Sequence, residues 1–301
     1  MSNKGIYLVA NKKSEALCAN LIYSIRESGC KLPIRIIHFG GEKIKSSFIL
    51  NEVELVSFQE FSKEAQDFVN NLRTVLIDCP MGFLYRFLAW YSDWDQFIYS
   101  DNDIVALCNW EKLFELVEDH DLLHCDTEYT TNGIFNYDKP ELMKATFGNN
   151  ALESALTAGH FLVRKNERMI EDINSAVSWY KKNPGIAKNH DQALLHIASL
   201  LGSWKMLNLC KSPYNWLSSW SGDFKHDLEL IQLSQAGKKI SHLHYSGGTP
   251  SGYSPIEELL LSSLSKKDRL KMYMKNSINH LSNFHYISTK YKRLKKKLKN
   301  R

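Results

Sequence analysis

The sequence predicts an α/β fold built on a mostly parallel, doubly wound sheet with helices on its faces. Within the first sixty residues, an apolar strand, an amphipathic helix and two further apolar strands follow one another. This alternation is typical of parallel sheets whose strands are joined by helices. The chain has 301 residues and is 44% hydrophobic, which is enough for a sizeable core.

The first third of the chain supplies four predicted strands and two predicted helices. The strands are expected over residues 5–11, 32–41, 52–58 and 96–103, and the helices over 14–30 and 83–95. The first helix has apolar residues at positions 17, 21, 22 and 25, and Gly29 ends it. Because ligands bind beyond the carboxyl ends of strands in open α/β sheets, the polar residues that end the fourth strand are candidates for a site.

The rest of the body adds two strands and two helices. The strands are expected over residues 157–166 and 238–248, and the helices over 168–183 and 190–202. The motif G-x-G-x-x-G follows no strand, and the motif G-x-x-x-x-G-K-S/T does not occur. These absences argue against a dinucleotide-binding dehydrogenase and against a P-loop enzyme.

Charge divides the chain into a body, residues 1–264, and a tail, residues 265–301. The tail holds 13 basic residues and one acid, whereas the body holds 25 basic and 32 acidic residues. Apolar residues recur along the tail at steps of three or four, from Leu270 to Leu298. We therefore expect a basic amphipathic helix that docks on an anionic membrane. The alternatives are a helix packed on the body and an arm that binds nucleic acid.

The lack of a recognisable targeting signal and the spacing of the cysteines indicate a cytoplasmic protein. No apolar run approaches the roughly 18 residues of a membrane span, and the run from Ile6 to Ala10 is too short for a signal peptide. The six cysteines form no C-x-x-C pair, so reduced and mostly buried thiols are expected. We expect the protein at the inner face of the membrane, held peripherally by its tail.

Asp101, Asn102 and Asp103 follow an apolar, aromatic strand. The plain alternative for such a segment is a turn, in which short polar side chains bond their own backbone. A calcium loop of the EF-hand type does not fit, because the next residues, "IVALCNW", are apolar. Two carboxylates at a strand end suit Mg²⁺ or Mn²⁺, which would bridge the protein to a diphosphate.

With these residues in order, the chain resembles the GT-A glycosyltransferases, most closely the retaining galactosyltransferase and glycogenin-like group. The resemblance covers residues 5–250 and rests on the segments "LVANKKSE", "LYRFLAWYSDWDQFIYSDND", "TAGHFLV", "NHDQALL" and "HYSGG". It implies transfer of a hexose from a nucleotide sugar, UDP-linked, to a glycan or lipid-linked acceptor. Surface polysaccharide or glycolipid synthesis, with retention of the anomeric configuration, is the implied process.

The resemblance also implies a role for each matching residue. Asp101, Asp103 and His244 would hold Mn²⁺ or Mg²⁺, with His242 as the alternative to His244. Asp191 and Gln192 would border the anomeric carbon as catalytic residues. The residues implied for nucleotide-sugar binding are Ala10, Asn11, Tyr85, Arg86, Asn102, Ala158, Gly159 and Gly247.

The chain departs from the family pattern at two places. Thr157 stands where the family has Asn or Asp, and "GGTPSG" replaces the usual Lys-Pro-Trp after the C-terminal His and Gly. The second departure removes a lysine expected at the diphosphate. The two departures leave undecided which donor sugar is used and which loop closes over it.

Several residues have a plain structural alternative. Arg86 could be a surface arginine of a helix, although its apolar neighbours favour a buried guanidinium with an anionic partner. Asp191 could be the N-cap of the helix that follows it. The aromatic segment "YNWLSSW", residues 214–220, could belong to the core or form a wall on which an acceptor sugar stacks.

Two rival functions follow from the same sequence. A sugar-1-phosphate nucleotidyltransferase would share the general fold, but the glycine-rich loop it needs is missing from "ANKKSEALC". A non-enzymatic module that binds membranes or nucleic acid would explain the tail and not the ordered segments of the body. We therefore expect a glycosyltransferase whose partners do not include nucleic acid.

Overall fold

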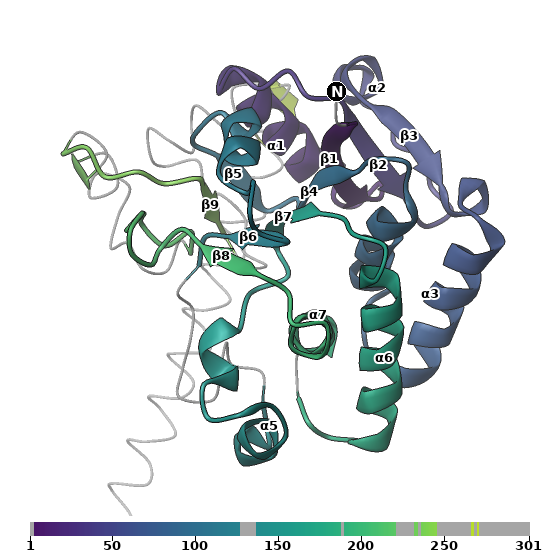
Figure 1. The fold of residues 1–301 in the computed structure, drawn as a ribbon. Coiled ribbons are helices and arrows are strands. Elements are labelled where there is room, and N and C mark those ends of the chain that lie inside the picture. The colour runs from purple at the N-terminus through teal and green to yellow at the C-terminus, as the bar shows by residue number, and fades with distance from the viewer. Residues whose placement is uncertain are drawn as a thin grey trace, which may run out of the picture.

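A seven-stranded sheet lies at the centre of the protein, with helices packed against it (Figure 1). The computed structural model describes residues 3–126, 137–187, 190–220, 232–233, 236–245, 266–267 and 270. The strands of the sheet are β1 (Lys4–Ala10), β2 (Ile34–His38), β3 (Glu54–Ser57), β4 (Gln96–Ser100), β6 (Leu122–His124), β7 (His160–Arg164) and β8 (Met206–Asn208). Their order across the sheet is β3-β2-β1-β4-β7-β6-β8.

The sheet is mixed but mostly parallel, as the sequence predicts. The pairs β1–β2, β1–β4, β2–β3 and β6–β8 are parallel. Only β7 runs antiparallel to its two neighbours, β4 and β6. Two further strands, β5 (Ile104–Ala106) and β9 (His242–His244), pair with each other in a separate antiparallel ribbon.

Helices cover the two faces of the sheet and define two cores. The α-helices are α1 (Glu15–Glu27), α2 (Ser47–Glu52), α3 (Lys63–Val75), α4 (Met81–Tyr85), α5 (Pro140–Phe147), α6 (Met169–Lys182) and α7 (His190–Leu201). Successive side chains of a strand point to opposite faces. In β4, Phe97 and Tyr99 therefore pack with α3, α6 and α7, whereas Ile98 packs with α1 and α2.

The predicted helix over 83–95 is wrong as a single α-helix. The structure has the short helix α4 followed by a 3₁₀ helix, η2 (Arg86–Tyr91), with Ser92 as its C-cap. Every residue from Arg86 to Trp90 is buried. The segment therefore lies inside the core rather than on its surface. The more tightly wound 3₁₀ helix, buried along most of its length, replaces the predicted α-helix.

The two late strands differ from the prediction. The strand expected over 157–166 covers only β7, and its reversed direction could not be read from the sequence. Of the strand expected over 238–248, residues 238–245 are described, and among these only β9 is a strand; it joins the small ribbon instead of the main sheet. Strand pairing depends on partners distant in sequence, which local patterns do not specify.

Two predictions fall where the structure gives no description. Gly247 lies outside the described residues, and so does the tail over 265–301 apart from 266–267 and 270. Among the helices that are described, none is long and apolar enough to cross a membrane. The membrane-docking helix therefore stays a prediction of the sequence.

The burial of Ile98 in the central strand gives a test of this core. Ile98 is 0% exposed, whereas Ile77 is 80% exposed. We expect Ile98→Ala to lower the free energy of unfolding by about 2 to 5 kcal/mol, because it removes buried methyl groups and leaves a cavity. Ile77→Ala is the matched control and should change it by less than about 0.5 kcal/mol. Urea denaturation of both variants measures the difference, and equal losses would contradict this packing.

Candidate active site

The candidate site forms where the end of β4 meets the start of β7. Ser100 lies opposite His160 in the antiparallel ladder. Directly beyond this pair, the backbone N–H of Asp101 donates to the carbonyl oxygen of Gly159 at 2.7 Å. The reversed direction of β7 thus brings Gly159 and its neighbour Ala158, the two residues implied to line the donor sugar, beside Asp101.

Three predicted metal ligands come together at this edge. One ligand atom from each of Asp101, Asp103 and His244 lies within 4.8 Å of the others. The Nε2 atom of His244 is 3.4 Å from Oδ1 of Asp103. The small ribbon produces this proximity, because β9 places His244 opposite Ile104, the residue after Asp103.

Gly159 gives His244 the room that it needs. A Cβ atom placed on Gly159 would lie 2.5 Å from Cε1 of His244, closer than carbon atoms can approach. The imidazole therefore packs directly on the backbone of β7. Gly159, predicted to contact the donor sugar, has a second role here, because its missing side chain leaves space for the predicted metal ligand His244.

The backbone on both sides of His244 is also fixed. Its N–H donates to the carbonyl oxygen of Ser219 at 2.7 Å, and the N–H of Tyr245 donates to the carbonyl oxygen of Asp103 at 2.9 Å. Trp220 forms an isolated parallel bridge with His244. Residues 214–220, expected to be core or a wall for the acceptor sugar, therefore end at Trp220, which lies beside the predicted metal ligand His244.

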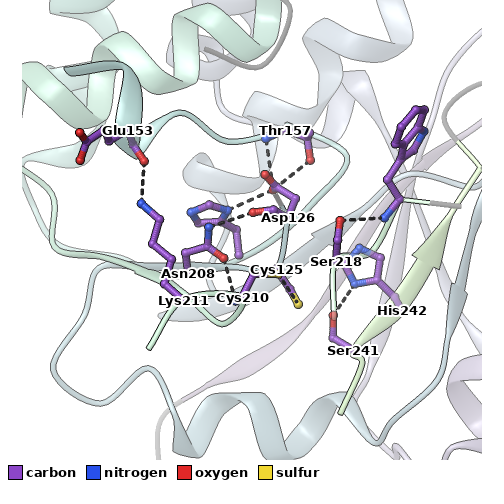
Figure 2. Close-up of polar contacts among 12 residues, drawn as sticks. Cys125, Asp126, Glu153, Thr157, Asn208, Cys210, Lys211, Ser218, Ser241 and His242 are labelled. Atoms are coloured by element: carbon purple, nitrogen blue, oxygen red, sulfur yellow. Dashed lines mark hydrogen bonds and ion pairs between the residues drawn. The ribbon is translucent and has the colours of Figure 1, made fainter. Parts of the chain in front are cut away.

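The alternative ligand His242 lies outside the three-residue cluster. Its ring is 4.0 Å from that of His160, and its Nδ1 atom is 2.6 Å from Oγ of Ser241 (Figure 2). Burial and the nearby His244 lower the pKa of His160 to about 3, so His160 is neutral. Burial, together with His160 and His244, also lowers the pKa of His242, so His160 and His242 form a neutral pair near His244.

Arg86 is a buried residue that links three parts of the site. It is 2% exposed, and its Nη2 atom is 3.3 Å from Oδ1 of Asp101. Its Nη1 atom is 3.2 Å from Oδ2 of Asp191 and also donates to the carbonyl oxygen of Ala158. Arg86 is therefore not a surface arginine but a bridge between β4, α7 and the segment before β7.

Electrostatics at the strand end favour a bound cation. Burial raises the pKa of Asp101, and the charge of Asp103 raises it further, while Arg86 and His244 act in the opposite direction. Burial alone would lower the pKa of Arg86, but Asp101, Tyr99 and Asp191 raise it above its ordinary value. Arg86 thus stays charged without fully compensating the Asp101 carboxylate.

The donor set matches a divalent metal. Two carboxylates provide the hard oxygen ligands of Mg²⁺ and Mn²⁺, and one imidazole adds a third ligand from β9. A cation between Asp101 and Asp103 would also relieve the repulsion that raises the pKa of Asp101. The residues present therefore fit the predicted metal.

The residues predicted to receive the nucleotide lie at the carboxyl ends of β1 and β4. Ala10 is fully buried at the end of β1. Asn102 donates from Nδ2 to the carbonyl oxygen of Val9 at 2.8 Å, which joins the two strand ends. Its Oδ1 atom is buried and has no hydrogen-bond partner among the described residues. A buried acceptor of this kind suits a donor group of a ligand.

Asn11 shapes the loop that follows β1. Its Oδ1 atom accepts from the backbone N–H of Lys13 at 2.9 Å and of Ser14 at 3.2 Å. This is the arrangement by which asparagine stabilises a turn. The loop enters α1 without the glycines of a phosphate-binding loop.

Tyr85 and Arg86 are neighbours that point to different surroundings. Tyr85 is half-buried and stacks on Phe58, with ring centroids 5.2 Å apart and planes 12° apart. Phe39 meets the same ring edge-on at 5.9 Å. Tyr85 is therefore part of an aromatic group beyond β2 and β3, whereas Arg86 enters the carboxylate cluster.

Asp191 lies in the first turn of α7, with Gln192 half-buried beside it. Because α7 begins at His190, Asp191 is inside the helix and not at its N-cap. It is 5% exposed and its carboxylate faces Arg86. An acid in the first turn is also stabilised by the helix dipole.

Sequence reasoning missed two residues of the site. The hydroxyl of Tyr99 donates to Oδ1 of Asp101 at 2.7 Å. Asp126, after β6, accepts at Oδ2 from the N–H of Thr157 at 3.3 Å and from its Oγ1 at 3.2 Å (Figure 2). Asp126 thus holds the segment that leads to Gly159. The pattern "DLLHCD", an apolar strand ending in Asp, was the available signal.

Comparison with known proteins identifies the family. A protein-family model described as "Mannosyltransferase putative" matches residues 3–183, which is more than half of the chain. The chain belongs to this family. It is a glycosyltransferase of the hexosyltransferase class with a GT-A-like fold. Among curated proteins, none matches it.

Three solved glycosyltransferases share the fold at low sequence identity. The bifunctional glycosyltransferase WbbM in its apo form has a TM-score of 0.62 at 13% identity, over 91% of this chain and 51% of that chain. An active-site mutant of LgtC has a TM-score of 0.52 at 12% identity, over 86% and 94%. Mouse xyloside xylosyltransferase 1 has a TM-score of 0.52 at 11% identity, over 83% and 100%. The chain thus spans about half the length of WbbM.

The contact between Gly159 and His244 can be tested without measuring catalysis. In Gly159→Ala, the added Cβ must displace the imidazole from the two aspartates. We expect the affinity for Mn²⁺ to fall by about 10- to 100-fold, the usual effect of displacing a ligand. Gly41→Ala is the control, because nothing lies within 4 Å of its new Cβ. Calorimetric titration with MnCl₂ measures both, and equal affinities would remove His244 from the metal site.

The Arg86 bridge predicts a loss of both stability and donor affinity. Arg86→Ala leaves the buried carboxylate of Asp191 and the half-buried carboxylate of Asp101 without their counter-ion, so unfolding should become easier by about 3 to 5 kcal/mol. Nucleotide-sugar affinity should fall on the order of tenfold to a hundredfold. The exposed Arg168→Ala serves as the control. Wild-type stability and affinity in Arg86→Ala would show that the bridge contributes to neither.

Proposed function

We propose that this protein is a metal-dependent hexosyltransferase that moves a hexose from a nucleotide sugar to a glycan or lipid-linked acceptor. The observation that carries the proposal is the cluster of Asp101, Asp103 and His244 beyond the carboxyl end of β4, with Arg86 behind it. Ligands bind at this edge of α/β sheets. The family to which the chain belongs supports glycosyl transfer.

Each residue of the site has its own proposed role in binding or catalysis. A divalent cation held by Asp101, Asp103 and His244 would supply a Lewis acid that stabilises negative charge on the departing diphosphate. Arg86 fixes the orientation of Asp101 through its 3.3 Å contact. Asn102 offers its buried Oδ1 atom as an acceptor for a hydroxyl group of the donor. Ala10 and Asn11 border the nucleotide from the end of β1.

Asp191 is the proposed catalytic carboxylate. It is buried, and it pairs with Arg86, whose guanidinium also donates to the carbonyl oxygen of Ala158, the residue implied to border the donor sugar. A carboxylate here would stabilise the positive charge that develops on the sugar ring as its bond to the diphosphate breaks. Gln192 would orient the sugar or the acceptor next to it. Retention of the anomeric configuration remains our proposal from the resemblance, and NMR of the product tests it.

The donor is proposed to be a UDP-linked hexose, and the description of the family adds mannose as a sugar to be tested. A nucleotidyltransferase would instead join a sugar 1-phosphate to a nucleoside triphosphate. The loop after β1 has no glycine, which favours the transferase. Gly247 is proposed as a further donor-binding residue on the sequence alone.

The proposed catalytic domain comprises residues 1–264, and the tail over 265–301 is proposed to hold it on the inner face of a membrane. The tail's 13 basic residues would each contribute about 1 kcal/mol near an anionic surface. Such docking would bring the site close to a lipid-linked acceptor.

Membrane docking is tested by co-sedimentation with liposomes. The full chain should pellet with anionic vesicles at low salt and less at high salt, because screening weakens the attraction. A chain that ends at Leu264 should remain in the supernatant. Equal pelleting of the two chains, or binding to neutral vesicles that salt does not change, would contradict the proposal.

The proposed reaction predicts slow, metal-dependent hydrolysis of a single donor. We expect one nucleotide sugar from a panel that includes UDP-hexoses and GDP-mannose to release its nucleoside diphosphate in the presence of Mn²⁺. EDTA should stop the release, and Asp103→Ala should abolish it while leaving the fold intact. The exposed Asp119→Ala is the matched control and should retain activity. Normal turnover by Asp103→Ala in the presence of EDTA would overturn the metal mechanism.

A further inference from the structure

Two cysteine thiols lie against each other at the ends of neighbouring strands. The Sγ atoms of Cys125, directly after β6, and Cys210, shortly after β8, are 3.7 Å apart (Figure 2). The two strands pair in parallel, with His124 opposite Asn208. Paired strands run about 4.8 Å apart, a separation that a disulfide can span.

The two thiols share one hydrogen-bond acceptor but differ in exposure. The Sγ atom of Cys125 is 3.4 Å from the carbonyl oxygen of Leu217, and that of Cys210 is 3.6 Å from the same atom. Cys125 is 1% exposed, whereas Cys210 is half-buried. Solutes can therefore reach Cys210 more readily than Cys125.

Cys125 and Cys210 are distinguished from the other cysteines by their direct sulfur–sulfur contact. Among the described hydrogen bonds and sulfur contacts, the pair Cys125–Cys210 is the only one that joins two thiols. Cys18 is fully buried, and burial and the nearby Glu15 raise its pKa. Burial and neighbouring thiols raise the pKa of the half-buried Cys108 to about 12. These thiols are protonated and poor nucleophiles.

We propose that Cys125 and Cys210 form an oxidisable dithiol that closes to a disulfide when a hydroperoxide reaches Cys210. The sulfur of Cys210 attacks the peroxide, whose O–O bond breaks to leave a sulfenic acid on Cys210 and a water molecule. The sulfur of Cys125 then attacks that of Cys210, and the S–O bond breaks as a second water leaves. The two thiols lose two electrons, and hydrogen peroxide gains them. A thiol reductant reverses the reaction.

Disulfide formation acts on the candidate active site from two sides. The sulfur atoms must approach from 3.7 Å to about 2.05 Å, and the disulfide has no S–H group left to donate to Leu217. Two residues later, the carbonyl oxygen of Ser219 holds the backbone of His244 at 2.7 Å. On the other strand, Cys125 precedes Asp126, which holds Thr157. Oxidation therefore shifts Ser219, which holds His244, and Asp126, which holds the segment before β7. Both shifts slow turnover.

Peptide mapping of the full chain tests the disulfide directly. After treatment with hydrogen peroxide, alkylation and digestion, we expect a linked peptide pair that contains Cys125 and Cys210 and has lost two hydrogen atoms. Dithiothreitol should separate the pair. The link should persist in the control Cys108→Ser and be absent from Cys210→Ser and Cys125→Ala. Alkylation of both cysteines after peroxide, or a sulfinic acid on Cys210 without a link, would overturn the proposal.

Donor hydrolysis tests the effect on the site, and this measurement rests on the proposed function. Peroxide should remove most of the hydrolysis by the wild type and by Cys108→Ser, and dithiothreitol should restore it. Cys210→Ser should be insensitive to peroxide. A linked peptide with unchanged hydrolysis would overturn the effect on the site. A linked peptide in a chain that hydrolyses no donor in either redox state would support the dithiol and count against the proposed function.

Discussion

The guanidinium of Arg86 is the interaction on which the candidate site depends. It contacts Asp101 at the end of β4, Asp191 in the first turn of α7 and the carbonyl oxygen of Ala158 before β7. A buried guanidinium needs anionic partners, and its planar fork of donors can serve several acceptors at once. Three segments that are distant in sequence are thereby held in one arrangement. The 3₁₀ helix that carries Arg86 through the core gives it this position.

The antiparallel direction of β7 and the absence of a side chain at Gly159 complete the arrangement. Because β7 runs against its neighbours, its first residues lie beside the last residues of β4. Gly159 then leaves the space into which His244 fits, and the β5–β9 ribbon holds that histidine beside Asp103. The predicted metal ligands thus come from the end of β4 in the main sheet and from the β5–β9 ribbon. Their relative position depends on one close contact between an imidazole and a backbone.

The charges of the site are unevenly compensated, which favours a bound cation. Arg86 supports Asp101 from the core side, yet burial and Asp103 still raise the pKa of Asp101. The carboxylate therefore gains from a cation on its open side, where a diphosphate would also need one. Beneath His244, the neutral His160 adds no opposing charge, since burial keeps its pKa near 3. The thiol pair lies outside this charged cluster and is linked to it through the backbone of Ser219 and through the side chain of Asp126.

The sequence by itself determined the α/β class and the aspartates at a strand end, whereas the choice of His244 over His242 needed the structure. These features are local: apolar runs mark the strands, and polar residues directly after them mark the edge where ligands bind. It also singled out Arg86, as a charged residue among apolar and aromatic neighbours. Only the tertiary structure decided the direction of β7, the 3₁₀ helix at Arg86, the second role of Gly159 and the support that Asp126 gives to Thr157. Each of these depends on contacts between residues far apart in the chain, and periodicity within a segment carries no information about such partners.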